Sequence, residues 1–160
     1  MNPLIEKFFK ETRSAFEFLE TDYNYFVNEK QENMDCFPDA IVSVNYANSL
    51  VEVKVFWHFA SATISVAFTF RGKIEESKLL FSRIIPTINI NTLLQSRSPE
   101  GSEAKSLKIT NGVTFSKIKK REKMINDDMK GEIAKQALLV KKYAMDIIEG
   151  DTSAFVISGR

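Results

Sequence analysis

The chain is poor in the residues on which many enzymes and metal sites depend. Its 160 residues include one histidine, His58, one cysteine, Cys36, and one tryptophan. Transition-metal sites need clusters of His, Cys and carboxylate ligands, and these two residues are far apart in the sequence. The six glycines form no phosphate-binding loop of the G-x-x-x-x-G-K-[ST] type. The sequence therefore argues against a transition-metal site and against nucleotide chemistry of this type.

The single cysteine and the absence of long apolar runs also bear on the compartment. One cysteine cannot form an intramolecular disulfide, and a free thiol suits a reducing compartment. The first residues, MNPLIEKFFKETR, mix charges into the apolar positions and do not resemble a secretory signal. No apolar run approaches the roughly 20 residues that span a bilayer. We therefore expect a cytoplasmic protein that has no membrane partner, with Cys36 buried or half-buried as a small hydrophobic residue.

The net charge is only +1, but the charges are unevenly distributed. Between residues 17 and 39, Lys30 is the only base among the acids Glu17, Glu20, Asp22, Glu29, Glu32, Asp35 and Asp39. Between residues 105 and 123, Glu122 is the only acid among the bases Lys105, Lys108, Lys117, Lys119, Lys120, Arg121 and Lys123. Charge runs are usually solvated surfaces, but opposed patches can also orient a charged partner.

Length and composition indicate a globular protein. The chain is 44% hydrophobic and 27% charged, with thirteen phenylalanines. A domain of this length buries roughly 70% of the surface that its unfolded chain exposes, so its core needs no metal or disulfide. We expect one α+β domain over residues 1–160, without a cofactor.

Helical periodicity marks both ends of the chain. Residues 3–20 repeat apolar side chains at about 3.6 residues, and Pro3 suits the first turn. A second apolar stripe runs over residues 128–149, with Asp127 and Asp128 as capping candidates and Gly150 at its end. The helical pattern can be followed back to Lys117. We expect this long C-terminal helix to pack on one face of a sheet.

The sheet is predicted from residues 41–71, where apolar and polar residues alternate over three successive runs. A two-residue turn at Asn48 and Ser49 would place Val44 opposite Val53. A similar turn at residues 60 and 61 would place Val55 opposite Val66. Both turns put the apolar residues on the same face. The sequence therefore predicts an antiparallel meander of three or more strands with one core face.

The other face of this meander is predicted to be polar and exposed to solvent. It carries Ser43, Asn45, Glu52, Lys54, Phe56, His58, Thr63, Ser65, Ala67 and Thr69. Phe56 is the exception. An aromatic residue on a polar sheet face is either covered by another segment or available to a partner. We favour cover by the C-terminal tail, TSAFVISGR, which supplies Phe155, Val156 and Ile157.

The middle of the chain is less regular. Residues 75–86 are typical of a short helix or helical turn that ends at Pro86, and residues 96–106 have the composition of an exposed loop. Asn111 and Gly112 suggest a hairpin over residues 106–118. A two-residue turn there would place Ile109 and Phe115 on opposite faces. Either the loop has an odd length or there is no hairpin.

Candidates for chemistry are few. His58 is the only near-neutral general base, on the polar face with Lys54, Thr63 and Ser65, but an exposed histidine near a turn is the more ordinary interpretation. A Cys36 and His58 pair is a weaker candidate, because the acidic neighbours of Cys36 disfavour a thiolate. The basic run KIKKREK, residues 117–123, could attract phosphates. It has no aromatic residue between its charges for base stacking, so a solvated helix start is favoured and nucleic acid is an unlikely partner.

Three stretches carry a resemblance to a known group. They are FLETDYNYF after the first helix, VSVNYANSLVEVKV in the sheet and KKYAMDIIEGDTSAF at the end of the last helix. Together they resemble small bacterial proteins that include immunity proteins of contact-dependent growth inhibition and other polymorphic toxin systems. The group often has Gly where this sequence has Asn24, and residues 85–125 match no pattern of the group. The resemblance implies an α+β fold and a cytoplasmic inhibitor of a cognate toxin domain.

Three functional hypotheses follow. The first is an immunity protein that binds a cognate toxin domain and occludes it. It uses no catalytic residue, and the acidic residues from Glu17 to Asp39, with Phe56 and His58, would contact the toxin. The alternative is a nucleic-acid-associated protein that uses residues 117–123. The second alternative is an enzyme centred on His58.

Overall fold

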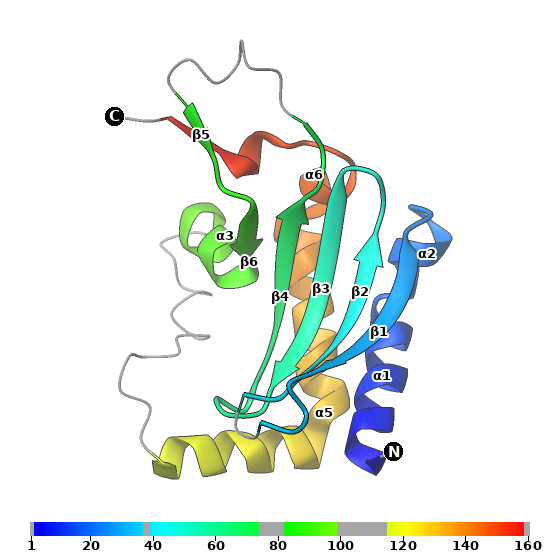
Figure 1. Ribbon diagram of the computed structural model, residues 1–160, viewed down its shortest axis with the longest axis vertical. Helices are drawn as coiled ribbons and strands as arrows, with labels where there is room; N and C mark the ends of the chain where they lie inside the picture. Colours follow the sequence, from blue (N-terminus) through cyan, green and yellow to red (C-terminus); the bar gives the residue numbers. More distant parts are fainter. Residues whose placement is uncertain (1, 37–38, 74–81, 99–114, 159–160) are drawn as a thin grey trace.

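The structure is an α+β fold with an antiparallel sheet and helices on one of its faces (Figure 1). The computed structural model describes residues 2–36, 39–73, 82–98 and 115–158. The fold class, the N-terminal helix and the long C-terminal helix on the sheet confirm the prediction from the sequence. Within the described residues, no helix is both long enough and apolar enough to pass through a lipid bilayer.

Five strands form the main sheet, in the order β1-β2-β3-β4-β6. They are β1 (Phe26–Glu32), β2 (Ile41–Ala47), β3 (Val51–His58), β4 (Thr63–Phe70) and β6 (Thr87–Asn89). A separate antiparallel pair joins β5 (Ser82–Ile84) to β7 (Val156–Ser158). The helices are α1 (Pro3–Ala15), α2 (Glu17–Thr21), α3 (Ile90–Arg97), α5 (Phe115–Tyr143) and α6 (Met145–Ile148), with a 3-10 turn, η3 (Ser153–Phe155).

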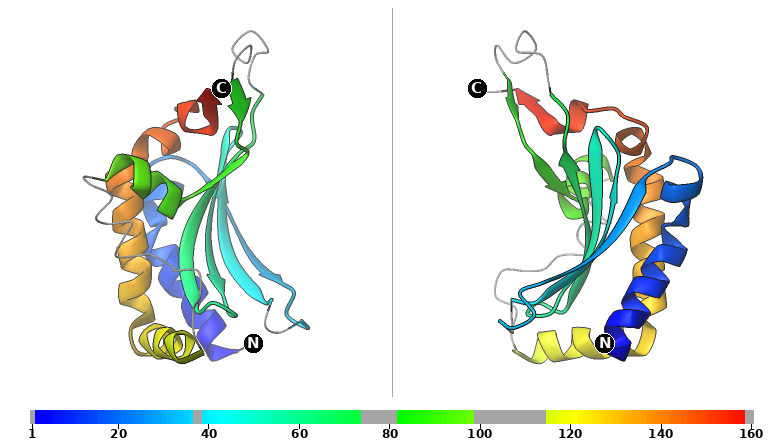
Figure 2. Two further views of the ribbon diagram at one scale, coloured as in Figure 1. Left: turned by 90° about the vertical axis from the view of Figure 1, so that its left-hand side faces the viewer. Right: turned by 45° about the vertical axis from the view of Figure 1, so that its right-hand side comes forward.

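The helical face of the sheet holds the core. Helix α1 contacts β2, and α5 contacts both α1 and β4 (Figure 2). The first helix is shorter than the predicted range of residues 3–20. It ends at Ala15, because Phe16 leaves the helical conformation (φ −106°, ψ 14°) before α2 begins. Phe16 is fully buried and its ring stacks on Tyr46 of β2, so packing against the sheet accompanies the break.

The predicted faces of the meander are correct, although one register is not. Strands β3 and β4 pair as predicted, with Val55 opposite Val66. Strands β2 and β3 are shifted by two residues, so that Val44 lies opposite Val55 instead of Val53. The two-residue turn lies at Ser49 and Leu50, one position later than predicted. The Asn48 N–H donates to the Val51 carbonyl (3.0 Å), and the Asn48 side chain accepts from the N–H groups of Leu50 (2.9 Å) and Val51 (2.8 Å). A shift of two leaves every side chain on the same face.

Strand β1 was not among the three predicted strands. Its sequence, FVNEKQE, has no regular apolar alternation, because it is an edge strand whose side chains are largely exposed. Charged residues on an edge strand discourage pairing with other chains. The turn before β1 contains Asn24 at φ 56°, in the left-handed region that glycine adopts most easily and asparagine tolerates.

Helix α5 begins at Phe115 and bends at Asp128, which has non-helical backbone angles (φ −142°, ψ 54°). The Asp128 carboxylate accepts a hydrogen bond from the backbone N–H of Gly131 at 3.0 Å. A Cβ at position 131 would collide with this carboxylate, so glycine permits the cap. The capping prediction for Asp128 is confirmed. Residues 115–118 are helical, which agrees with the helical pattern followed back to Lys117 and leaves no hairpin strand there. The rest of the possible hairpin, residues 106–114, lies outside the described residues.

The remaining predictions for the middle of the chain have mixed outcomes. Residues 82–84 form strand β5 instead of the predicted helical turn, because they pair with β7 from the C-terminus. The rest of that helix, residues 75–81, and most of the loop expected at 96–106 lie outside the described residues. Arg97, at the end of α3, donates to both carboxylate oxygens of Asp146 (2.6 and 2.9 Å) and to the Tyr143 carbonyl (2.7 Å). This bidentate pair fastens α3 to the end of α5 and to α6.

Candidate functional site

The sheet face opposite the helices is the first candidate site. The register places the predicted polar residues on it, and β1 adds Phe26, Asn28, Lys30 and Glu32. All described helices lie on the other side of the sheet (Figure 2). We call this surface, which β1, β2, β3 and β4 form, the open face.

The centre of the open face is more buried than the sequence predicts. Ser43 is 0% exposed, Asn45 is 4% exposed and Ser65 is also buried. Phe56 lies between Ser43 and Ser65 in the register of β2, β3 and β4. The prediction of a solvent-exposed face is therefore wrong for these three small polar residues, because larger neighbours shield them.

An ion pair adds to this shielding. Lys54 Nζ of β3 lies 2.9 Å from a carboxylate oxygen of Glu32 on β1. Glu32 is opposite Ile41 on β2 and Lys54 is opposite Asn45, so the pair crosses β2 diagonally at the level of Ser43. The two charges neutralise each other and leave a polar surface of low net charge at the centre of the face.

Two buried polar atoms beneath this layer have no hydrogen-bond partner in the part of the chain that the structure describes. They are the Ser43 Oγ and the Asn45 Oδ1. A buried polar group without a partner costs about 1–3 kcal/mol, and most such groups in folded proteins are paired. Both atoms are buried, so a molecule that docks on the open face of this structure does not reach them.

A substitution tests whether the buried Ser43 hydroxyl lowers the free energy of unfolding. Ser43→Val is expected to raise the free energy of unfolding by about 1–2 kcal/mol, because it removes an unpartnered hydroxyl and adds a β-branched residue to a central strand. Ala67→Val, on the same face of β4, adds methyl groups without removing a polar atom and is the matched control. Urea unfolding of both variants measures the difference. Equal effects of the two substitutions would contradict the prediction.

Phe56 is half-buried at the centre of the open face, and the C-terminal tail does not cover it. Phe155, from that tail, is fully buried on the helical face, where its ring centre lies 5.5 Å from that of Phe70. Val156 pairs with Ile84 in the small second sheet. The favoured expectation of a covering tail is therefore wrong for the described part of the tail. The other interpretation of Phe56, contact with a partner, stays a prediction.

His58 lies at the end of β3, where it closes the β3–β4 turn. Its Nδ1 is 2.8 Å from the Ser61 hydroxyl and accepts the Ser61 backbone N–H at 3.3 Å. Accepting this N–H requires an unprotonated Nδ1, which places the ring proton on Nε2. The turn thus occupies one of the two ring nitrogens. This arrangement fits the structural interpretation of His58 better than that of a general base.

Cys36 is exposed, in contrast to the buried or half-buried position predicted for it. It lies in the connection between β1 and β2, where its backbone N–H donates to Asn33 and its carbonyl accepts from Asp39. The prediction fails because Cys36 lies in a turn at the surface after β1, where its side chain is exposed.

The predicted acidic residues do not form one patch. Glu17, Glu20 and Asp22 lie on or beside α2, at the start of β1. Asp35 and Asp39 follow the other end of β1. The two groups are therefore separated by the length of the strand, about 20 Å.

Two of the acids are partly neutralised on the helical side of β1. Arg13 of α1 lies 3.5 Å from Glu20 and 3.9 Å from Glu29. Glu32 pairs with Lys54 on the open face. Of the seven acids in this stretch, those without an ion pair to the described residues are Glu17, Asp22, Asp35 and Asp39, all exposed. Negative charge thus remains at both ends of β1.

The basic run of residues 117–123 lies on the first part of α5. Five basic side chains within seven helical residues point in several directions, because a helix has 3.6 residues per turn. Lys119 lies over the ring of Phe115, 4.8 Å from its centre, and Arg121 turns into a hollow beside β4. The basic side chains of residues 117–123 therefore do not share one face of α5. Nucleic-acid binding remains the alternative hypothesis.

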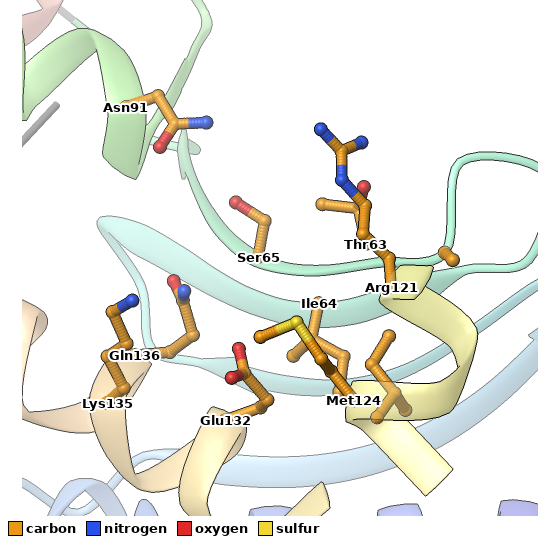
Figure 3. Close-up of a pocket in the computed structure, with 11 residues that line it drawn as sticks. Thr63, Ile64, Ser65, Asn91, Arg121, Met124, Glu132, Lys135 and Gln136 are labelled. Carbon is orange, nitrogen blue, oxygen red and sulfur yellow. The ribbon is translucent and has the colours of Figure 1, made fainter. Parts of the chain in front are cut away.

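A second candidate site was missed by the sequence analysis. It is a hollow of about 210 Å³ beside the outer edge of β4, bounded by α3 and by both parts of α5 (Figure 3). Its polar lining includes Ser65, Asn91, Arg121, Glu132 and Gln136. Sequence reasoning had no signal for it, because these residues are up to 71 positions apart and only the bend of α5 brings them together.

Among the residues that the structure describes, no group of three or more His, Cys, Asp or Glu side chains is arranged to hold a metal ion. Comparison with protein-family models, with curated proteins and with solved structures finds no match to this chain.

Proposed function

We propose that this chain is a cytoplasmic immunity protein that binds a cognate toxin domain through the open face and neutralises it by occlusion. The observation that supports this proposal best is the composition of the open face. A half-buried aromatic residue, Phe56, stands next to buried polar atoms that have no partner, on a surface that no described helix covers. Inhibition by occlusion needs a stable scaffold and a complementary surface, and it needs no catalytic group.

The open face has the anatomy of a protein interface. Interfaces concentrate their binding energy in a few central, well-packed residues, often aromatic, within a polar rim. Phe56 occupies the centre, and Lys30, Glu52 and the Glu32–Lys54 pair lie around it.

The charges at the ends of β1 favour a basic partner. The unpaired acids of α2 and of the β1–β2 connection lie at the two ends of the edge strand. A basic domain, such as a toxin that cleaves nucleic acid, would be attracted to both ends while its surface covers Phe56. Such steering raises the association rate and weakens with salt.

The test is growth of cells that express the toxin-like domain encoded immediately upstream of this gene, with and without this chain. We expect growth to be restored by this chain and not by an unrelated immunity protein. No rescue, or the absence of a toxic neighbour, would contradict the proposal. Salt-dependent binding of DNA or RNA that requires residues 117–123 would then support the alternative.

Phe56→Ala is expected to weaken toxin binding at least about tenfold, because a central aromatic anchor loses its contact area. Leu138→Ala is the matched control. Leu138 is an exposed hydrophobic residue on α5, away from the open face, and its substitution is expected to leave the affinity unchanged. Isothermal titration calorimetry with a catalytically inactive toxin variant gives both values. Equal affinities for the two variants would place the interface elsewhere.

A further inference from the structure

We propose that the hollow between β4, α3 and α5 binds a small zwitterion that carries a carboxylate and an ammonium group, a ligand of the size and charge of a free amino acid. This site is separate from Phe56 and the ends of β1. The inference goes beyond the proposed function and does not depend on it.

The size of the hollow limits the ligand. Its volume is about 210 Å³. An engineered cavity of roughly 150 Å³ takes up benzene, so this space admits a molecule slightly larger than benzene. Sites for drug-sized ligands and cofactors usually measure about 300–1,000 Å³, which makes a nucleotide too large. Ile64, Met124 and Ile125 provide apolar walls on which a short side chain can pack.

Arg121 is suited to the carboxylate. Its Nη1 atom is buried and has no hydrogen-bond partner among the residues that the structure describes. A guanidinium carries a permanent positive charge and binds a carboxylate with two parallel hydrogen bonds. Lys135, a second positive charge in the lining, lies beside Gln136 on the other side of the hollow from Arg121 (Figure 3). A carboxylate bound at Arg121 would supply both the negative charge and the hydrogen-bond acceptor that its guanidinium can use.

Gln136 and Glu132 are suited to the ammonium group. Gln136 is only 3% exposed, and its Oε1 has no hydrogen-bond partner within the described ranges of the chain. This oxygen can only accept, so it requires an N–H or O–H donor. Glu132, one helical turn earlier, adds a negative charge beside it. An ammonium group supplies several donors and the matching charge.

The arrangement of these groups fits a ligand with two opposite charges. Figure 3 shows Arg121 on one side of the hollow, Gln136 and Glu132 on the other, and Ser65 between them. In a straight helix, positions 121 and 136 would be about 22 Å apart along the axis. The bend at Asp128 allows both to line the same hollow. The Asp128 cap at this bend therefore also helps to form the site.

The test is binding of the common L-amino acids, one at a time, to the full chain by thermal unfolding and calorimetry. We expect at least one to bind. At a concentration of 100 times its Kd, a ligand raises the folding equilibrium constant about 100-fold. The N-acetyl and the carboxamide derivatives of that amino acid, which each lack one charge, are expected to bind at least about tenfold more weakly.

Variants locate the site. Arg121→Met and Gln136→Leu are each expected to weaken binding of the amino acid at least about tenfold. Lys120→Met removes an exposed charge next to Arg121 and outside the hollow, so its binding is expected to equal that of the natural chain. Circular dichroism verifies that each variant folds. The proposal is overturned if no amino acid binds at about 10 mM, or if all three variants bind equally well.

Discussion

Phe155→Ala is expected to lower the free energy of unfolding by about 3–5 kcal/mol, the usual cost of removing a fully buried phenylalanine. The Phe155 side chain is completely buried and packs against Phe70. Its carbonyl also accepts a hydrogen bond from the backbone N–H of Ile85 at 2.7 Å. The segment after α6 thus supplies a core residue and closes one end of the sheet.

Urea unfolding monitored by circular dichroism measures this effect. The control is Phe26→Ala, because Phe26 is 82% exposed and its loss is expected to change stability by less than about 0.5 kcal/mol. If Phe155→Ala costs no more than the control, then the tail does not belong to the core.

Stability is expected to fall steeply between pH 10 and 12. Burial raises the pKa of the Tyr25 hydroxyl to about 12, and this hydroxyl donates to the Ile148 carbonyl at 3.0 Å. Burial also raises the pKa of the Tyr46 hydroxyl, which donates to the Thr12 carbonyl at 3.3 Å. Both hydroxyls tie the sheet side of the core to helical segments, and both must keep their protons to donate.

The direction of the effect follows from proton binding. Above pH 10 an unfolded chain releases its tyrosine protons, whereas the folded chain retains those of Tyr25 and Tyr46. The folded state therefore binds more protons in this range, and its stability falls as pH rises. The stability that these two protonated hydroxyls contribute to the folded state is therefore fully present below pH 10. For Tyr25 the loss approaches about 2–3 kcal/mol by pH 12.

Urea unfolding at pH 8, 10 and 11.5 tests this expectation in the natural chain and in Tyr25→Phe. The variant is expected to be about 1 kcal/mol less stable at pH 8, because it lacks one hydrogen bond, and to lose less stability as pH rises. All other groups are the same in both proteins, so their effect cancels in the comparison. Parallel stability curves for the two proteins would show that Tyr25 does not titrate as expected.

The two candidate sites are adjacent in the fold. Ser65 lies opposite Phe56 in the β3–β4 register, and it also lines the hollow beside α5. The open face and the hollow therefore meet along β4. If both proposals hold, an amino acid in the hollow would lie next to the proposed toxin interface.

Much of the sheet could be predicted, because the side-chain period of a strand is two. The faces of Val44, Val53 and Phe56 were correct even where the register was shifted by two residues. Strand β1 could not be predicted, since an exposed edge strand needs no apolar alternation. Its pairing with β2 is a tertiary contact that only the folded sheet provides.

The candidate sites were less predictable than the sheet. Phe56 and His58 were placed correctly on the open face, but the burial of Ser43 depends on the Glu32–Lys54 pair that crosses it. The acidic stretch looked continuous in the sequence, whereas an extended strand of seven residues separates its two ends. Distance along a chain does not give distance in space once part of the chain is extended.

By itself, the sequence determined the α+β class, the core face of the meander and the Asp128 cap, because these depend on local periodicity and on side-chain to backbone hydrogen bonds. Only the tertiary structure decided that the tail closes the core, that Ser43 and Asn45 are buried without partners, and that Arg121 and Gln136 line one hollow. These features arise from contacts between segments far apart in the sequence, and the free energy of such contacts depends on how the segments pack together.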